Sequence, residues 1–127
     1  MDKMSMSHED YLEAMVMLGA SQTTGVRSVD VAEKLGVSKA SVSKAVAGLR
    51  EAGYLDQAHY GSITLTERGL ERGCAVLERH EMLTRFLSKG LGIAPEVAEH
   101  EACQMEHAIS DDSFKKWFAF VEKLGLD

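Results

Sequence analysis

The sequence predicts a mainly α-helical protein, in which an N-terminal winged helix-turn-helix is followed by an all-helical domain. Apolar residues recur at helical spacing along most of the chain. Residues 28–49 have the spacing of two helices joined by a tight turn. Residues 55–65 then alternate between apolar and polar on either side of a turn, which is typical of a β-hairpin and supplies the wing.

The composition is that of an ordinary globular chain. Its 127 residues suffice for one domain or for two small ones sharing a core, and 45% are hydrophobic while 27% are charged. The longest uncharged apolar stretch, residues 14–20, is too short to cross a bilayer, and the N-terminus has no apolar signal core. Two cysteines do not make a disulfide framework. We therefore expect a reduced, cytoplasmic protein with no membrane partner.

Helix caps and glycines divide the chain into its expected elements. Ser7, Ser28, Ser38 and Ser110 are candidate N-caps, because a serine hydroxyl can accept a hydrogen bond from a backbone N–H group of the first helical turn. Glycine and proline residues then separate the helices. The expected helices span about residues 7–18, 29–35, 38–52, 66–89, 95–109 and 111–124, with the hairpin at residues 55–65.

The helix-turn-helix rests on four positions. Ala32 is small enough for close helix approach, Gly36 permits positive φ in the turn, and Val42 and Ala45 pack the second helix on the first. That second helix begins with small hydroxyl residues and two lysines, which suit contact with phosphates and base edges. We expect DNA contacts from Ser38, Lys39, Ser41, Ser43 and Lys44 of this helix, and from His59 and Tyr60 at the wing tip.

The net charge of −6 argues at first against a nucleic-acid partner, but the charge is unevenly distributed. Residues 27–52 hold five basic and three acidic residues, whereas residues 96–112 hold six acidic residues and no lysine or arginine. The mildly basic segment contains the helix-turn-helix. Two other interpretations stay open: a surface helix that only packs on its neighbour, and a winged helix that binds a protein.

A group of metal-donor side chains lies near the C-terminal end of the chain. Cys103, Glu106 and His107 have the i, i+3, i+4 spacing that puts side chains on one helix face, and Glu99 lies one turn earlier. Sulfur, oxygen and nitrogen donors facing one small volume are plausible ligands of a transition metal. An ordinary solvated polar face with an incidental cysteine is the alternative.

Two further segments offer donors. Asp10 and Glu13 lie at i and i+3 in the first expected helix, and His80 lies in the long fourth helix. The carboxylates could instead simply favour a helix N-terminus, and a lone histidine is more often half-buried in a helix than a ligand. Cys74 lies off the face of His80 and is interpreted as a small core or surface thiol.

Taken together, these segments resemble the diphtheria toxin repressor/manganese transport regulator family of metal-dependent repressors. The resemblance runs from Ser7 to about Leu124. Its combination of motifs is highly specific, although no single motif is. The matching segments are EDYLE at residues 9–13, the helix-turn-helix at 28–49, GSITLT at 61–66, RH at 79–80 and EACQMEH at 101–107.

The resemblance implies a homodimer that represses iron or manganese homeostasis genes by binding a palindromic double-stranded DNA operator when loaded with divalent metal. No small organic ligand is expected. It implies a winged helix-turn-helix DNA-binding domain over residues 1–70 and a helical metal-binding and dimerisation domain over 71–127, with the first helix contributing ligands. The family's ligand positions match here at Asp10, Glu13, His80, Cys103, Glu106 and His107.

The donor set combines two branches of that family. The iron branch resembles this chain at Cys103 but usually has methionine in place of Asp10, whereas the manganese branch resembles it at Asp10 and Glu13 but usually has glutamate in place of Cys103. Carboxylates suit Mn²⁺ or Fe²⁺, and a thiolate favours softer ions such as Fe²⁺, Co²⁺ or Zn²⁺. We therefore favour Fe²⁺ over Mn²⁺, with one or two divalent ions per subunit.

Aromatic residues near the C-terminus support a dimer. Half of the chain's eight aromatic residues lie within residues 114–120. Phe118 and Phe120 cannot both lie on one helix face, so we expect one of them to meet a partner.

Two other classes of protein compete with a metal-dependent regulator. A metalloenzyme would need a substrate pocket and an open coordination position, and the sequence has no separate nucleophile, phosphate loop or cofactor motif, so we expect no enzyme. The alternative function is a metal-independent winged-helix regulator that senses redox state, through Cys103, or a small molecule.

Overall fold

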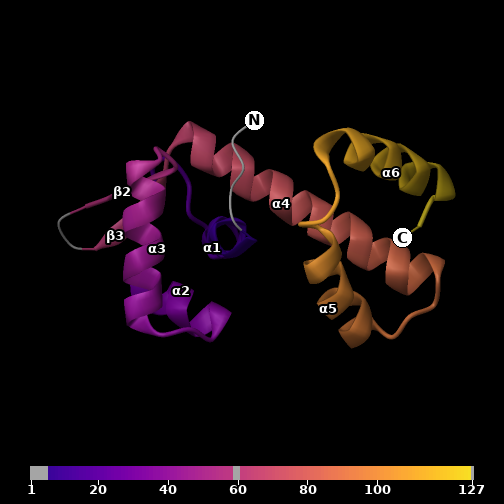
Figure 1. The fold of residues 1–127 in the computed structure, drawn as a ribbon, viewed down its shortest axis with the longest axis horizontal. Helices are drawn as coiled ribbons and strands as arrows, with labels where there is room; N and C mark the ends of the chain where they lie inside the picture. The colour runs from indigo at the N-terminus through magenta and orange to yellow at the C-terminus, as the bar shows by residue number, and fades with distance from the viewer. Residues whose placement is uncertain (1–5, 59–60, 127) are drawn as a thin grey trace. The chain divides into compact units, whose positions relative to one another are not determined.

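The computed structural model describes residues 6–58 and 61–126, and these residues form helices and one small sheet (Figure 1). The chain divides into two units, one ending at Ala75 and the other beginning at Val76, and helix α4 contributes to both. Within the described residues, no helix is long and apolar enough to cross a membrane. The elements are α1 (Met6–Met17), β1 (Val26–Arg27), α2 (Ser28–Leu35), α3 (Lys39–Glu51), β2 (Leu55–Gln57), β3 (Ser62–Leu65), α4 (Glu67–Arg85), η1 (Phe86–Gly90), α5 (Pro95–Met105) and α6 (Asp111–Leu124).

The first unit is a winged helix-turn-helix, as predicted. Its sheet has the order β1-β3-β2, and both pairings are antiparallel, with Val26 opposite Ile63 and Leu55 opposite Leu65. Side chains on β3 alternate between half-buried and buried, so one face of the sheet packs on the core. The two-residue strand β1 was not predicted, because it is too short to show an alternating pattern.

The turn between α2 and α3 has the geometry that the sequence predicts. Gly36 adopts a left-handed conformation with φ of 67°. The N–H of Val37 donates to the carbonyl of Ala32 at 3.0 Å, and the N–H of Gly36 donates to that of Glu33. Ser38 then caps α3, because its hydroxyl accepts from the N–H of Ser41 at 3.1 Å. These bonds fix where α3 begins.

A close approach of α1 to α4 completes the first unit. A Cβ atom on Gly73 would lie 2.6 Å from Val16 Cγ2 and 2.9 Å from the carbonyl oxygen of Leu12. Only glycine therefore lets α4 pass this close to α1. Leu12 and Met15 of α1 are fully buried in the same core as Val42 and Leu49 of α3. The helix that carries Asp10 and Glu13 is thus held by packing on both sides.

The second unit packs α5 and α6 around the later part of α4 and the π-helical turn η1. Leu83, Leu87, Ala98, Ala102 and Val121 form its buried centre. Trp117 meets the Phe86 ring edge-to-face, with centroids 5.6 Å apart. As expected for α6, Phe118 packs on this core whereas Phe120 is 55% exposed.

Several predicted boundaries were wrong. Helix α1 begins at Met6, before the proposed cap Ser7, and α2 begins at Ser28, with Arg27 at the N-cap position and no side-chain cap. The regular α-helix α4 ends at Arg85 and continues as η1. Helix α5 ends at Met105 rather than near 109, and Glu106 and His107 lie in the turn that follows.

The Gly73 contact can be tested by substitution. Gly73→Ala should lower the free energy of unfolding by roughly 1–3 kcal/mol, because the added methyl group overpacks the α1–α4 contact. Urea denaturation measures this change. Gly48→Ala is the matched control in a helix: its Cβ would lie 3.4 Å from the His8 ring, an ordinary contact. That control should be neutral or stabilising, by up to about 1 kcal/mol, and equal losses in both variants would contradict the packing argument.

Candidate metal centre and DNA-binding surface

The second unit brings four of the predicted metal ligands together. His80 comes from α4, Cys103 from the last turn of α5, and Glu106 and His107 from the residues just after α5. Glu106 keeps near-helical geometry at the C-cap, because its N–H still donates to the carbonyl of Ala102 at 2.9 Å. Its side chain therefore lies close to that of Cys103, as the i, i+3 spacing predicts.

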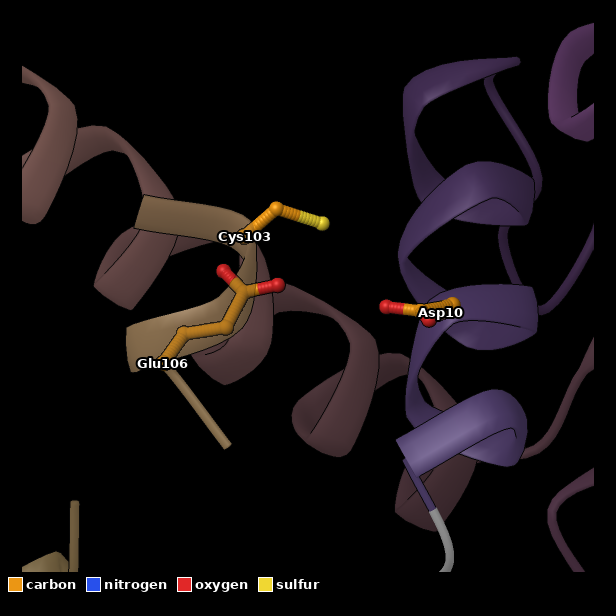
Figure 2. A group of neighbouring side chains, drawn as sticks. All are labelled: Asp10, Cys103 and Glu106. Atoms are coloured by element: carbon orange, nitrogen blue, oxygen red, sulfur yellow. The ribbon is translucent and has the colours of Figure 1, made fainter. Parts of the chain in front are cut away.

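Glu106 is the centre of this group. Glu106 is only 1% exposed to solvent. His80 Nδ1 lies 3.3 Å from one carboxylate oxygen and His107 Nε2 lies 3.4 Å from the other. The Cys103 sulfur lies within 4.8 Å of a Glu106 carboxylate oxygen. Oxygen, nitrogen and sulfur donors thus surround one small volume, and Figure 2 shows Cys103 and Glu106 extending from the same end of α5.

The carboxylate of Glu106 has no hydrogen bond from the described part of the chain. Both of its oxygens are enclosed and have no hydrogen-bond partner among the described residues, although one imidazole nitrogen lies near each of them. A buried carboxylate without hydrogen bonds is destabilising unless a cation is present. The donor set therefore fits a divalent metal ion: a carboxylate and imidazoles suit Mn²⁺ or Fe²⁺, and a thiolate suits Fe²⁺ or softer ions.

The first unit carries the other two predicted ligands. Asp10 and Glu13 lie on α1, half-buried and buried respectively, and Figure 2 draws Asp10 on that helix. Glu9, which directly precedes Asp10, is buried and accepts a hydrogen bond from Arg72 of α4 at 2.7 Å. The neighbouring Glu9 thus has an arginine partner that fixes α1 on α4.

The predicted DNA-contacting residues of the second helix lie at the N-terminal end of α3. Val42, Ala45, Val46 and Leu49 of the same helix are buried. Ser38, Lys39, Ser41, Ser43 and Lys44 are all exposed, and the Ser38 hydroxyl donates to that of Ser41 at 3.0 Å. The other two predicted contacts, His59 and Tyr60, lie outside the described residues.

Sequence reasoning missed the arginines that hold the ligand-bearing segments. Arg72 contacts Glu9 on α1, and Arg79 contacts the turn that follows α5. The pairing partners are 63 and 30 residues away along the chain. No local spacing indicates contacts of that kind, although Arg79 adjoins the predicted ligand His80.

Fold and site together define a DNA-binding regulator with a metal-binding domain, and comparison with known proteins agrees. Residues 3–63 match the family model of the iron-dependent repressor N-terminal DNA-binding domain. Residues 66–127 match the model of the iron-dependent repressor metal-binding and dimerisation domain. The two matches together cover nearly the whole chain.

Individual relatives agree with the family models. The chain is 33% identical to an uncharacterised HTH-type transcriptional regulator of Methanocaldococcus jannaschii, over 94% of this chain and 96% of that protein. It is 32% identical to the transcriptional regulator MntR of Salmonella typhimurium, over 92% of this chain and 73% of MntR. A solved manganese-dependent transcriptional repressor in complex with manganese matches with a TM-score of 0.79 and 30% identity, over 91% of this chain. This chain spans about half of that structure's length, 52%.

The chain belongs to the iron-dependent repressor family, which includes the MntR regulators, and the predicted family is confirmed. It is a metal-dependent transcriptional regulator with an N-terminal DNA-binding domain followed by a metal-binding and dimerisation domain.

Substitution of Glu106 separates its metal-binding role from a structural one. In chelator at pH 8, Glu106→Met should raise the free energy of unfolding by roughly 1–3 kcal/mol, because it removes a buried carboxylate that lacks hydrogen bonds. The same variant should lose the rise in melting temperature that divalent metal gives the unaltered protein. Glu101→Met, at an exposed position of α5, should change stability by less than about 0.5 kcal/mol. A large loss of stability in metal-free Glu106→Met would contradict this assignment.

Proposed function

We propose that this protein is a cytoplasmic homodimeric repressor that binds a palindromic operator when its ligand residues hold Fe²⁺ or Mn²⁺. The observation that carries the proposal is the buried Glu106 carboxylate, which lies between two imidazoles and accepts no hydrogen bond from the described residues. Such a group has little structural use without a cation. The exposed serines and lysines at the N-terminal end of α3 support the DNA half of the proposal.

The proposed ligands are Asp10, Glu13, His80, Cys103, Glu106 and His107. The α1 pair is joined to the other four ligands by the family resemblance. Asp10 and Glu13 would then complete with oxygen donors a group that already contains sulfur and nitrogen.

Fe²⁺ is the metal that the donor chemistry favours. Asp10, Glu13 and Glu106 supply hard oxygen donors and Cys103 supplies a soft thiolate, and Fe²⁺ accepts both kinds. Mn²⁺ is the second candidate, because MntR relatives and a manganese-dependent repressor are among the similar proteins. One or two divalent ions per subunit would suit the negative charge of this donor set.

Activation follows from the placement of ligands in both units. In a site formed by these ligands but empty of metal, the carboxylates of Asp10, Glu13 and Glu106 would repel one another, and packing alone would hold α1 in place. A bound divalent cation would supply the positive charge that balances them. Asp10 and Glu13 would then fix α1, and with it α3, in one orientation relative to the dimerisation domain. Two α3 helices of a dimer would match half-sites about one DNA turn apart.

Side-by-side DNA binding under anaerobic conditions tests the proposal. Duplexes selected from a random pool should bind more tightly with Fe²⁺ or Mn²⁺ than with chelator, by roughly 1–3 kcal/mol of coupling energy or about 5- to 150-fold. Fluorescence anisotropy with Fe²⁺, Mn²⁺, Co²⁺ and Zn²⁺ measures the order of preference. Equal affinity with every metal and with chelator would support the metal-independent regulator instead.

Cys103→Ser extends this measurement to the thiolate. The hydroxyl is a harder, weaker donor, so metal preference should move from Fe²⁺ towards Mn²⁺. The selected DNA sequence should not change, because α3 is unaltered. A change in DNA sequence preference without a change in metal preference would contradict the assigned role of Cys103.

The lysines of α3 have a separate test. Lys39→Met and Lys44→Met should each weaken binding to all duplexes and reduce the slope of log affinity against log salt concentration by about 1 per lost phosphate contact. Lys115→Met, at an exposed position of α6, is the control for lost positive charge. If Lys115→Met reduces the slope as much as the α3 variants, the DNA surface has been misplaced.

A further inference from the structure

Two of the proposed ligands, Glu106 and His107, lie just after the last residue of α5. Helix α5 ends at Met105, and residues 106–109 form a turn. Carbonyl groups at a helix C-terminus have no partner within the helix. The carbonyl groups of this turn therefore need partners from outside α5.

Arg79 of α4 is such a partner. Its Nη1 donates to the carbonyl oxygen of Ile109 at 3.0 Å and, more weakly, to that of Glu106 at 3.4 Å. Its Nη2 forms an ion pair with Asp111 at the start of α6. The guanidinium carbon also lies 4.9 Å from the centroid of the Phe114 ring. One side chain, 14% exposed, thus spans both ends of the α5–α6 connection.

Arg79 and His80 are adjacent in α4, and both lie close to Glu106. Arg79 contacts its backbone carbonyl, whereas the His80 ring lies 3.3 Å from its carboxylate. The same helical turn therefore carries one proposed metal ligand and also fixes the main chain of another. A displacement of residues 106–109 would move Glu106 and His107 together relative to His80.

We propose that Arg79 is a positioning residue of the metal centre, which sets the separation of His80 from Glu106 and His107. The inference rests on the proposed metal-binding function. Groups that orient ligands without touching the metal typically change metal affinity 10- to 100-fold when removed. The planar guanidinium suits this task because its fixed fork of donors reaches two carbonyls and a carboxylate at once.

Arg85 shows what a merely structural arginine on the same helix looks like. Its Nη2 lies 3.5 Å from Glu122 Oε1, and the two side chains are 37% and 56% exposed. That pair joins α4 to α6, and neither of its residues lies in the α5–α6 turn. Arg85→Met is therefore the matched control for Arg79→Met, with the same residue exchange on the same helix.

The experiment is anaerobic titration of the full chain with Co²⁺, whose visible absorption reports ligand geometry and whose thiolate charge-transfer band reports Cys103. Arg79→Met should weaken Co²⁺ binding by 10- to 100-fold and alter the absorption spectrum per bound ion. Arg79→Lys, which keeps the charge and loses the fork, should fall between Arg79→Met and the unaltered protein. Arg85→Met should match the unaltered protein in affinity and spectrum.

The outcomes are distinguishable. If Arg79→Met only unfolds more easily, while its Co²⁺ affinity and spectrum per bound ion equal those of Arg85→Met, the positioning role is wrong. If Arg79→Met does not fold, Asp111→Asn removes one arm of the contact and should weaken Co²⁺ binding severalfold; unchanged binding there overturns the inference. Absence of Co²⁺, Fe²⁺ and Mn²⁺ binding by the unaltered protein would instead overturn the proposed function.

Discussion

The buried carboxylate of Glu106 is the constraint around which the second unit is organised. A carboxylate that is 1% exposed and accepts no hydrogen bond from the described residues is unfavourable in an isolated helical unit. Ala98 and Ala102 pack fully on the core, so the last turn of α5 cannot rotate to release Glu106 to solvent without breaking apolar contacts. Packing therefore keeps this carboxylate buried, where a bound cation would balance its charge. The metal-free unit is less stable as a result, but its affinity for a cation is higher.

Features that depend on neighbouring residues could be predicted from the sequence. Ser38 and Ser110 cap their helices, because an N-cap is decided within four residues. Gly36 has positive φ in the turn before α3, because no other residue adopts that conformation as readily. The donors His80, Cys103 and Glu106 were predicted from spacing and from the family resemblance, and the structure brings them together within their unit.

Features that depend on residues far apart in the sequence could not be predicted. Nothing near Ser28 shows that Arg27 would occupy the cap position through pairing of β1 with β3. The turn that ends α5 is in contact with Arg79, which lies 27 residues before Glu106. Apolar periodicity continues past Met105 through Ile109, so the pattern alone predicted a longer helix. Such contacts are set by tertiary structure, which single-sequence patterns do not record.

The contact between Trp117 and Phe86 gives the molecule an internal optical probe. Trp117 is the chain's single tryptophan and lies in the second unit, whereas two of the three tyrosines, Tyr11 and Tyr54, are buried in the first unit. Indole emission therefore reports the surroundings of η1 and α6, while tyrosine absorbance and far-ultraviolet circular dichroism include the winged helix. Following both signals during denaturation would show whether the two units unfold together or in sequence.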